Sequence, residues 1–299
     1  TNPMQTGANR QKTIEMIHKL DFMMTVDIVM SDTAWMADLV LPAPSYLERQ
    51  DPVSAFLASS SCSGVLTRDP IVPAMFESKP VFWIVTELAK RLDLGEHFDF
   101  TIEDFRKAQL KKLPEVAKAL KNDGVYNIVG HSHGIHEGKP FKTRSKKIEL
   151  YNDRYAENGI DPMPVYHSPQ RVPQGRFRIV VGRNAYITQS ASTNNALLWE
   201  LEHENSLWIH PDSAKGLAIG HGDMVEVKSQ AGSGQLKAMV TEKIRPDTVY
   251  MDTGFGVISK GLSKIFGKGA CIVDVLIDEA DEISGNMAMH ETIVSVKKV

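Results

Sequence analysis

The residues best suited to chemistry are the polar side chains that follow a short apolar run after the middle of the chain. The run covers residues 178–181 and breaks at Gly182-Arg183. Beyond it lies a polar ladder of hydroxyl and amide side chains: Thr188, Gln189, Ser190, Ser192, Thr193, Asn194 and Asn195. These side chains donate and accept hydrogen bonds without carrying a charge. So many of them directly after a strand end indicate a binding site for a large polar ligand.

A structural interpretation of the ladder stands beside this one. Ser192 to Asn194 could cap the short helix that is predicted to start near Ala196, because Ser, Thr and Asn accept hydrogen bonds from the free N–H groups of a helix start. The residues alone favour neither interpretation, and both can hold at once.

A second polar group follows a mostly apolar run at residues 23–30. Asp27 lies near the end of this run, and Ser31, Asp32 and Thr33 follow it as possible helix caps. Ligands of open α/β sheets bind beyond the carboxyl ends of the strands. There, a carboxylate could accept two parallel N–H bonds from a guanine edge. The residues alone favour the simpler alternative, in which Asp27 caps a helix or pairs with a lysine.

The elements that must position these groups differ between the two halves. In the first half, helical spacing at 13–20 and 79–94 and buried strands at 23–30 and 39–41 predict α/β layering with part of a parallel sheet. In the second half, short β-runs separated by tight turns predict a closed β-barrel. The runs are residues 177–181, 207–209, 224–228, 235–241, 248–251, 272–277 and 292–297. We therefore predict an α/β domain at 1–145, a Pro-rich linker at 146–174 and a barrel at 175–299.

Composition narrows the function. The chain has 299 residues, 42% of them hydrophobic, and a net charge of −3, as in ordinary soluble globular proteins of two domains. The charge gives little support for nucleic-acid binding. No apolar stretch has the length of a membrane span, so we expect no direct contact with the bilayer core.

Metal ligands are not expected in this chain. Cys62 and Cys271 lie far apart and lack a CxxC partner, which argues against disulfide, zinc and iron–sulfur sites. We interpret Cys62 as an inert thiol in a polar loop at 59–64. The types of His131, His133 and His136 suit a metal, but the glycines around them predict a solvated loop.

Four segments together resemble the C-terminal portion of a molybdopterin oxidoreductase of the dimethyl-sulfoxide-reductase superfamily. They are VDIVMSDTAWMADLVLPAPSYLERQD (26–51), IVVGRNAYITQSASTNN (179–195), WIHPDSAKGLAIGHGDMVEVKS (208–229) and EISGNMAMHETIVSVKK (282–298). The first is most similar to the polysulfide and thiosulfate reductase branch. The order of the segments is more specific than any one alone.

The resemblance implies molybdenum held by two molybdopterin guanine dinucleotides. The α/β domain would supply part of the contacts to this cofactor, and a double-psi type barrel would supply the rest. Asp27, Ser31 and Thr33 would lie near a guanine. Gly182 would let the backbone approach the cofactor, and Arg183 would bind phosphate or a pterin oxygen. The remaining implied contacts to the pterin are Gln189, Ser190, Thr193, Asn195 and Asn205.

The chain also departs from the family pattern. The family's Gly-Ala-Asn-x-Asn corresponds here to Gly269-Ala270 followed by Cys271, which puts one amide contact in doubt and leaves open whether Asp274 replaces it. Many relatives have His where this chain has Thr188-Gln189. The family's iron–sulfur cysteines and molybdenum ligand belong to an N-terminal portion that this sequence does not contain.

We therefore expect a cofactor-binding fragment of a longer enzyme that reduces polysulfide or thiosulfate, inactive alone and with catalytic residues elsewhere. The resemblance implies as partners the rest of its own subunit, an iron–sulfur electron-transfer subunit and a membrane-anchor subunit, and a periplasmic location. The alternatives are a fragment of a formate dehydrogenase, nitrate reductase or arsenate reductase, a standalone nucleotide-binding module, or a structural subunit with a degenerate site.

Overall fold

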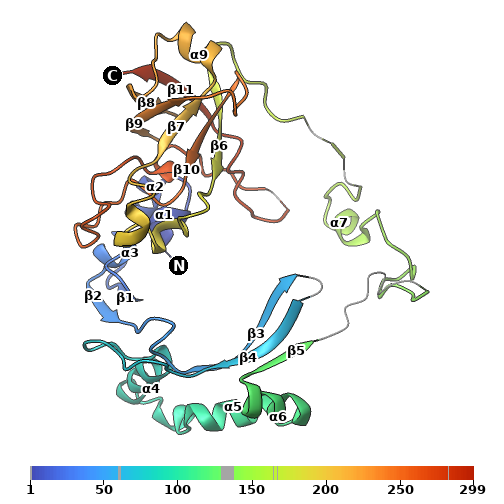
Figure 1. Ribbon diagram of the computed structural model, residues 1–299. Coiled ribbons are helices and arrows are strands. Elements are labelled where there is room, and N and C mark those ends of the chain that lie inside the picture. Colours follow the sequence, from blue (N-terminus) through green and yellow to red (C-terminus); the bar gives the residue numbers. More distant parts are fainter. Residues whose placement is uncertain (1, 60–61, 129–137, 164, 167, 282) are drawn as a thin grey trace. The chain divides into compact units, whose positions relative to one another are not determined.

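The computed structural model describes residues 2–59, 62–128, 138–163, 165–166, 168–281 and 283–299 (Figure 1). The chain forms two compact units, residues 1–42 with 169–299 and residues 43–168. The first 42 residues thus belong to the same unit as the C-terminal part of the chain, whereas the sequence prediction groups them with residues 43–145. His131, His133 and His136 lie outside the described residues.

The first unit contains a closed six-stranded barrel. Its strands are β6 (Phe177–Gly182), β7 (Ser206–Ile209), β8 (Met224–Lys228), β9 (Ser233–Val240), β10 (Thr248–Asp252) and β11 (Ile293–Lys298), in the order β10-β6-β11-β8-β9-β7. The pairs β10/β6 and β7/β9 are parallel, and the other pairs are antiparallel. The barrel confirms the fold expected from the sequence, and its parallel pairs fit the double-psi type.

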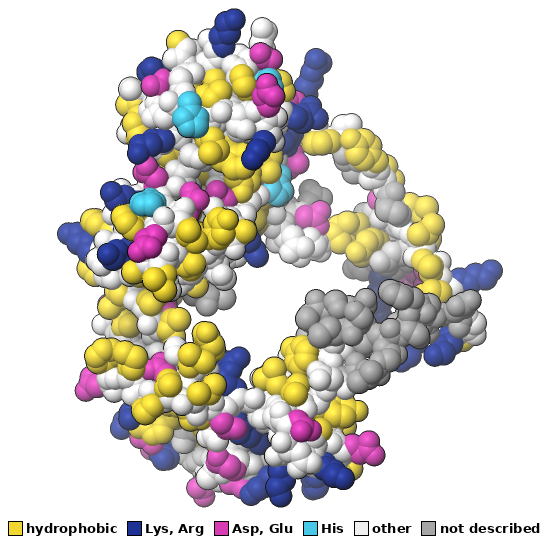
Figure 2. All heavy atoms as spheres, in the orientation of Figure 1, with side chains coloured by type: hydrophobic (Ala, Val, Ile, Leu, Met, Phe, Trp, Pro, Cys, Tyr) yellow, Lys and Arg dark blue, Asp and Glu magenta, His cyan; other side chains and the backbone are white. Residues whose placement is uncertain are grey.

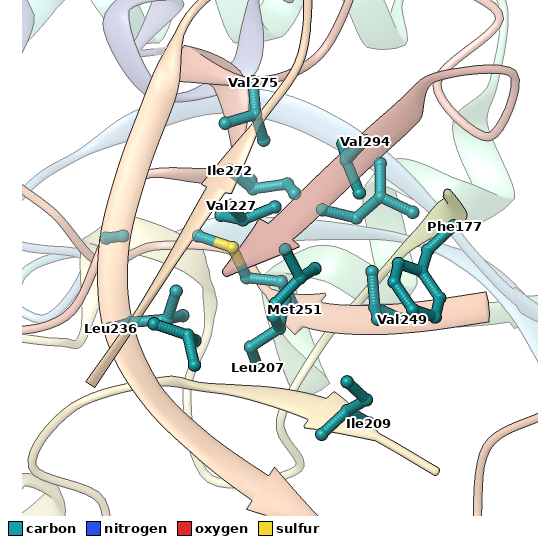
Figure 3. Close-up of a cluster of buried hydrophobic side chains, with 14 of the residues drawn as sticks. Phe177, Leu207, Ile209, Val227, Leu236, Val249, Met251, Ile272, Val275 and Val294 are labelled. Carbon is teal, nitrogen blue, oxygen red and sulfur yellow. The ribbon is translucent and has the colours of Figure 1, made fainter. Parts of the chain in front are cut away.

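Alternate residues of the barrel strands point inward and form one core. Inward positions such as Ile179, Leu207, Val225, Val249 and Val294 are fully buried, while their neighbours along each strand are more exposed. Figure 3 shows side chains of the barrel strands meeting with Ile272 and Val275 in this interior. Burial of each such side chain stabilises the unit by about 1.5–3 kcal/mol.

Residues 272–277 correct one sequence prediction. They do not form a strand; the 3-10 helix η3 (Ile272–Asp274) lies there and is followed by a turn. The apolar residues of this segment are buried against the barrel core. A continuous apolar run shows burial but does not distinguish a strand from another buried segment.

The start of the chain forms short elements in the same unit. The helices α1 (Pro3–Thr6), α2 (Arg10–Ile17) and α3 (Asp32–Trp35) accompany the strands β1 (Met24–Asp27) and β2 (Leu39–Pro42). β1 and β2 pair in parallel, as the α/β prediction expects. Ser31 is the N-cap of α3, and its Oγ accepts a hydrogen bond from the N–H of Ala34 at 3.2 Å.

Four further helical segments lie between the barrel strands along the chain. They are the 3-10 helix η2 (Gln189–Ala191), α8 (Ala196–Trp199), α9 (Pro211–Gly216) and η3. Pro211 occupies the first turn of α9, where its missing N–H costs no helical bond.

The second unit places helices beside an antiparallel sheet of β3 (Asp51–Ser59), β4 (Cys62–Arg68) and β5 (Val125–Ile128). Cys62 therefore begins a strand, which corrects the predicted polar loop at 59–64. The helical segments are α4 (Val81–Arg91), η1 (Gly95–Phe98), α5 (Ile102–Leu110), α6 (Pro114–Asp123) and α7 (Asp153–Glu157). A capping box of Thr101 and Asp104 starts α5, and Gly124 in the left-handed conformation ends α6.

Charged side chains of both signs are interspersed on the face that Figure 2 shows. Among the described helices, none is long and apolar enough to cross a membrane.

Candidate functional site

A cavity of about 290 Å³ lies where β6 and β10 end in the first unit. The two strands are parallel, with Asp252 opposite Gly182, so their carboxyl ends meet at the same edge of the barrel. Thr253 continues the pairing, because its N–H donates to the Gly182 carbonyl at 3.2 Å. The lining residues are Gln5, Thr6, Val181, Gly182, Arg183, Gln189, Ser190, Thr253, Gly254, Val273, Met289 and His290. Four predicted binding residues, Gly182, Arg183, Gln189 and Ser190, thus share one cavity.

Gly182 is required by the packing of the barrel itself. A Cβ at this position would lie 2.3 Å from the Tyr250 ring. The Tyr250 hydroxyl donates to Asp252 Oδ1 at 2.5 Å, and Trp208 packs on the ring of Tyr250 with centroids 4.8 Å apart. Burial raises the pKa of Asp252, and the Tyr250 hydrogen bond opposes this shift. The missing side chain makes room for a tyrosine at this strand end.

A glycine also brings the polar ladder against the end of β10. Gly254 has φ +95°, and a Cβ there would lie 2.7 Å from the backbone carbon of Gln189. The η2 turn therefore rests directly on the backbone after Thr253. Ser190 Oγ in this turn accepts a hydrogen bond from Asn2 Nδ2 at 3.1 Å. These contacts fix the ladder turn on both sides.

The N-terminal wall of the cavity is held by a buried polar network. Gln5 is 4% exposed; its Nε2 donates to Asp32 Oδ2 at 2.5 Å, and its Oε1 accepts from Cys271 Sγ at 3.3 Å. Asp32 is fully buried and also accepts from the N–H groups of Ile258 and Ser259 at 2.9 and 2.8 Å. Burial raises the pKa of Cys271 to about 12, which keeps the thiol protonated as a donor.

Arg10 and Asp274 form the ionic part of this wall. The guanidinium binds the carboxylate through two nitrogens, at 2.6 and 2.5 Å, and a third nitrogen donates to the Gly256 carbonyl at 2.9 Å. Burial raises the pKa of Asp274, while the charge and hydrogen bonds of Arg10 act against the shift. Both carboxylate oxygens of Asp274 therefore accept hydrogen bonds from Arg10 in this structure.

The cavity lining suits an anionic ligand. Among the described residues that line it, none is Asp or Glu, whereas Arg183 is exposed and has no ion-pair partner within the described part of the chain. Thr253 Oγ1 is shielded from solvent and finds no hydrogen-bond partner among the described residues. An unsatisfied hydroxyl in a cavity wall is the kind of atom that a bound ligand or water satisfies. A free guanidinium and several neutral donors can bind phosphate or a polar ring edge.

The other predicted residues lie elsewhere in the unit. Asp27 accepts from Ser31 Oγ at 2.6 Å and from the Ile28 N–H at 2.7 Å, within its own turn. Asp27 therefore neither caps a helix nor pairs with a lysine among the described residues, because Ser31 is the N-cap of α3 and Asp27 bonds only within its own turn. Thr33 donates from Oγ1 to Asn2 Oδ1 at 2.6 Å and is buried. Neither residue lines the cavity.

The three remaining candidates are bonded within the chain. Thr193 is 1% exposed, and its hydroxyl donates to the Ser190 carbonyl at 3.3 Å. Asn195, and not the preceding polar residues, caps α8 by accepting from the N–H groups of Leu197 and Leu198. Asn205 is 1% exposed and uses its whole amide: Nδ2 donates to the carbonyls of Asp252 and Ala270 at 2.9 Å each, and Oδ1 accepts from the Ala270 N–H at 3.0 Å.

Gln5, Thr253 and His290 also line the cavity, although no local pattern groups them. They lie far from one another and from Arg183 in the chain, and only the barrel topology brings them together. Across the described ranges, no three His, Cys, Asp or Glu side chains gather closely enough to hold a metal ion.

Comparison with known proteins places these features in a family context. The family model described as molybdopterin oxidoreductase matches residues 1–91, and that described as Molydopterin dinucleotide binding domain matches residues 177–293. The second match covers the barrel from β6 to β10 and most of the residues that line the cavity. Both models name the same class of cofactor, which agrees with a cavity suited to an anionic ligand.

Relatives and solved structures extend the likeness over most of the chain. The chain is 29% identical to the molybdopterin-containing subunit PhsA of thiosulfate reductase from Salmonella typhimurium, over 85% of this chain and 37% of that one. It is 26% identical to the putative dimethyl sulfoxide reductase chain YnfE of Escherichia coli, over 94% of this chain and 39% of that one. The fold is shared with acetylene hydratase from Pelobacter acetylenicus (TM-score 0.79, 22% identity, 100% of this chain and 43% of that one). The chain thus spans about two fifths of the length of these proteins.

Proposed function

Because the chain belongs to the molybdopterin oxidoreductases, we propose that its barrel cavity holds the phosphorylated dinucleotide part of a molybdenum–molybdopterin cofactor. The observation that carries this proposal is the lining itself, in which the unpaired Arg183 stands among neutral donors without any acidic side chain among the described residues. A phosphate placed there would gain a charge-assisted bond to Arg183 and would meet no acidic side chain among the described residues of the lining.

The residues of the cavity would have separate tasks. Arg183 would bind phosphate oxygens through its planar fork. The side chains of Gln189 and Ser190 would contact the polar edge of the pterin or nucleotide, because amides and hydroxyls both donate and accept. The buried network of Gln5, Asp32 and Arg10 would hold the opposite wall in place. When bound, the cofactor supplies two-electron redox chemistry, while the chain supplies binding and orientation.

We propose that the base of the cofactor's nucleotide is guanine. The proposed substrate of the whole enzyme is a sulfur compound, polysulfide or thiosulfate. The resemblance of residues 26–51 to the polysulfide and thiosulfate reductase branch and the 29% identity to a thiosulfate reductase subunit support this choice. The similar identity to a dimethyl sulfoxide reductase chain makes sulfoxide the rival substrate.

The test begins with native protein purified from its own organism. We expect molybdenum in it, guanosine monophosphate on acid hydrolysis, and oxidation of reduced viologen dye with polysulfide or thiosulfate. Dye oxidation with dimethyl sulfoxide alone would change the substrate and leave the cofactor proposal intact. Protein free of both molybdenum and nucleotide would refute the cofactor proposal.

A further inference from the structure

His290 and Arg183 both line the cavity, and the His290 ring contacts the edge of β6 at Val181. The segment before β11 carries it, and β11 itself begins only at Ile293. Arg178 Nη1 donates to the His290 carbonyl at 2.9 Å and also binds Glu291 at 2.5 Å. The backbone of His290 is thus tied to β6 near the cavity.

The imidazole ring completes the hydrogen bonding of β6 where the partner strand is missing. The Ile179 N–H donates to the Thr292 carbonyl at 3.0 Å. Two residues on, the Val181 N–H points to the same edge, since strand residues alternate with a period of two. Its acceptor is His290 Nδ1, at 3.4 Å.

This contact assigns the tautomer of the ring. A neutral imidazole accepts at one nitrogen and donates at the other, so Nδ1 as acceptor leaves the proton on Nε2. Among the described residues, none accepts a hydrogen bond from Nε2. The ring therefore has a free donor at the wall that also carries Gly182 and Arg183.

We propose that His290 is a further phosphate-binding residue of this cavity, in which Nε2–H donates to the anion that Arg183 binds. The inference rests on the proposed function and deepens it, because it adds a second donor to the phosphate site. Such a donor would make binding depend on the C-terminal segment as well as on β6.

Two substitutions separate the roles of the two ring nitrogens. His290→Asn places an amide oxygen near the position of Nδ1, so it keeps the acceptor for the Val181 N–H and loses the distal donor. His290→Gln extends an amide N–H toward the position of Nε2 and loses the near acceptor. Arg183→Gln tests the proposed function, and Arg171→Gln changes an exposed arginine that does not line the cavity.

The experiment is calorimetric titration of the 299-residue chain and each variant with guanosine diphosphate, together with thermal unfolding without ligand. We expect His290→Asn to weaken binding about tenfold, as for loss of a hydrogen bond to a charged group, with little change in Tm. His290→Gln should lower Tm but keep more affinity than His290→Asn. Arg171→Gln should bind as the unchanged chain does.

The outcomes distinguish the two proposals. Unchanged affinity in His290→Asn, with weakened binding in Arg183→Gln, would overturn the role of His290 alone and leave it as a cap of β6. Unchanged affinity in Arg183→Gln, or no binding by the unchanged chain, would overturn the proposed function and this inference with it.

Discussion

Asn205 offers the sharpest test of how the barrel end is built, because the structure assigns its amide wholly to internal bonds. Asn205→Ala removes three hydrogen bonds and leaves two carbonyls and one N–H without their partner in a site that is 1% exposed. A buried group deprived of its partner costs about 1–3 kcal/mol. Carbonyls tolerate this better than an N–H group, since they have a second lone pair. We therefore expect a loss of about 3 kcal/mol in the free energy of unfolding.

Urea unfolding followed by tryptophan fluorescence measures this loss. Trp83 belongs to the second unit, whereas Trp35, Trp199 and Trp208 belong to the first, so a Trp83→Phe background reports on the barrel unit. With a slope of about 2 kcal/mol per M, the midpoint should fall by about 1.5 M. Asn195→Ala is the matched control, because it removes an exposed amide cap worth about 1 kcal/mol. A loss below about 1 kcal/mol for Asn205→Ala would refute the reasoning.

Three further predictions concern the same unit. Gly182→Ala should lower the free energy of unfolding, measured in urea, by about 2 kcal/mol, because the added Cβ displaces the Tyr250 ring. Added to Tyr250→Ala, the same change should cost less than about 1 kcal/mol, and equal costs in both backgrounds would contradict this packing. Arg10→Ala should destabilise the unit by about 3–5 kcal/mol, since it leaves Asp274 partly buried without its charge partner, and an unfolding midpoint that does not move would disprove this role. Burial raises the pKa of Asp252, so the folded chain binds this proton more tightly than the unfolded chain. The protonated carboxyl therefore stabilises the fold at low pH, and this stabilisation is lost as pH rises from the ordinary pKa through the raised one. Asp252→Asn should therefore gain stability relative to the unchanged chain as pH rises from about 4 to 7, and a stability difference independent of pH would refute the shift.

Much of the fold could be predicted because burial imposes a period on the sequence. Strand β8 matches its predicted range; β6, β7 and β10 differ from theirs by one residue at one end, and β9 and β11 differ by one or two residues at each end. The prediction of a strand at 272–277 was wrong, because the apolar run there reflects burial in a segment without strand pairing. The sheet of β3, β4 and β5 needs residues 125–128 to pair with residues 63–66, a contact that local patterns do not specify.

The site shows the same limit. The polar ladder after β6 can be recognised from the local sequence. Four of the residues predicted there line one cavity: Gly182, Arg183, Gln189 and Ser190. Asn195 and Asn205 have the same chemistry in the sequence, but the Asn195 amide caps a helix and the Asn205 amide joins the end of β10 to Ala270. Gln5 and His290 reach the cavity only through the fold. Residue type predicts which groups can bind a ligand, and internal hydrogen bonds decide which are free.

The most direct test of the central claim is the cofactor content of the native protein with and without Arg183. Native protein, Arg183→Gln and the control Arg171→Gln should be purified from the same host, and bound molybdopterin measured as its fluorescent oxidised derivative per mole of chain. We predict that Arg183→Gln loses about tenfold or more of its bound molybdopterin, that Arg171→Gln keeps its full content, and that both variants unfold at equal midpoints. Equal cofactor content in all three proteins would contradict the claim that this cavity holds the phosphorylated part of the cofactor.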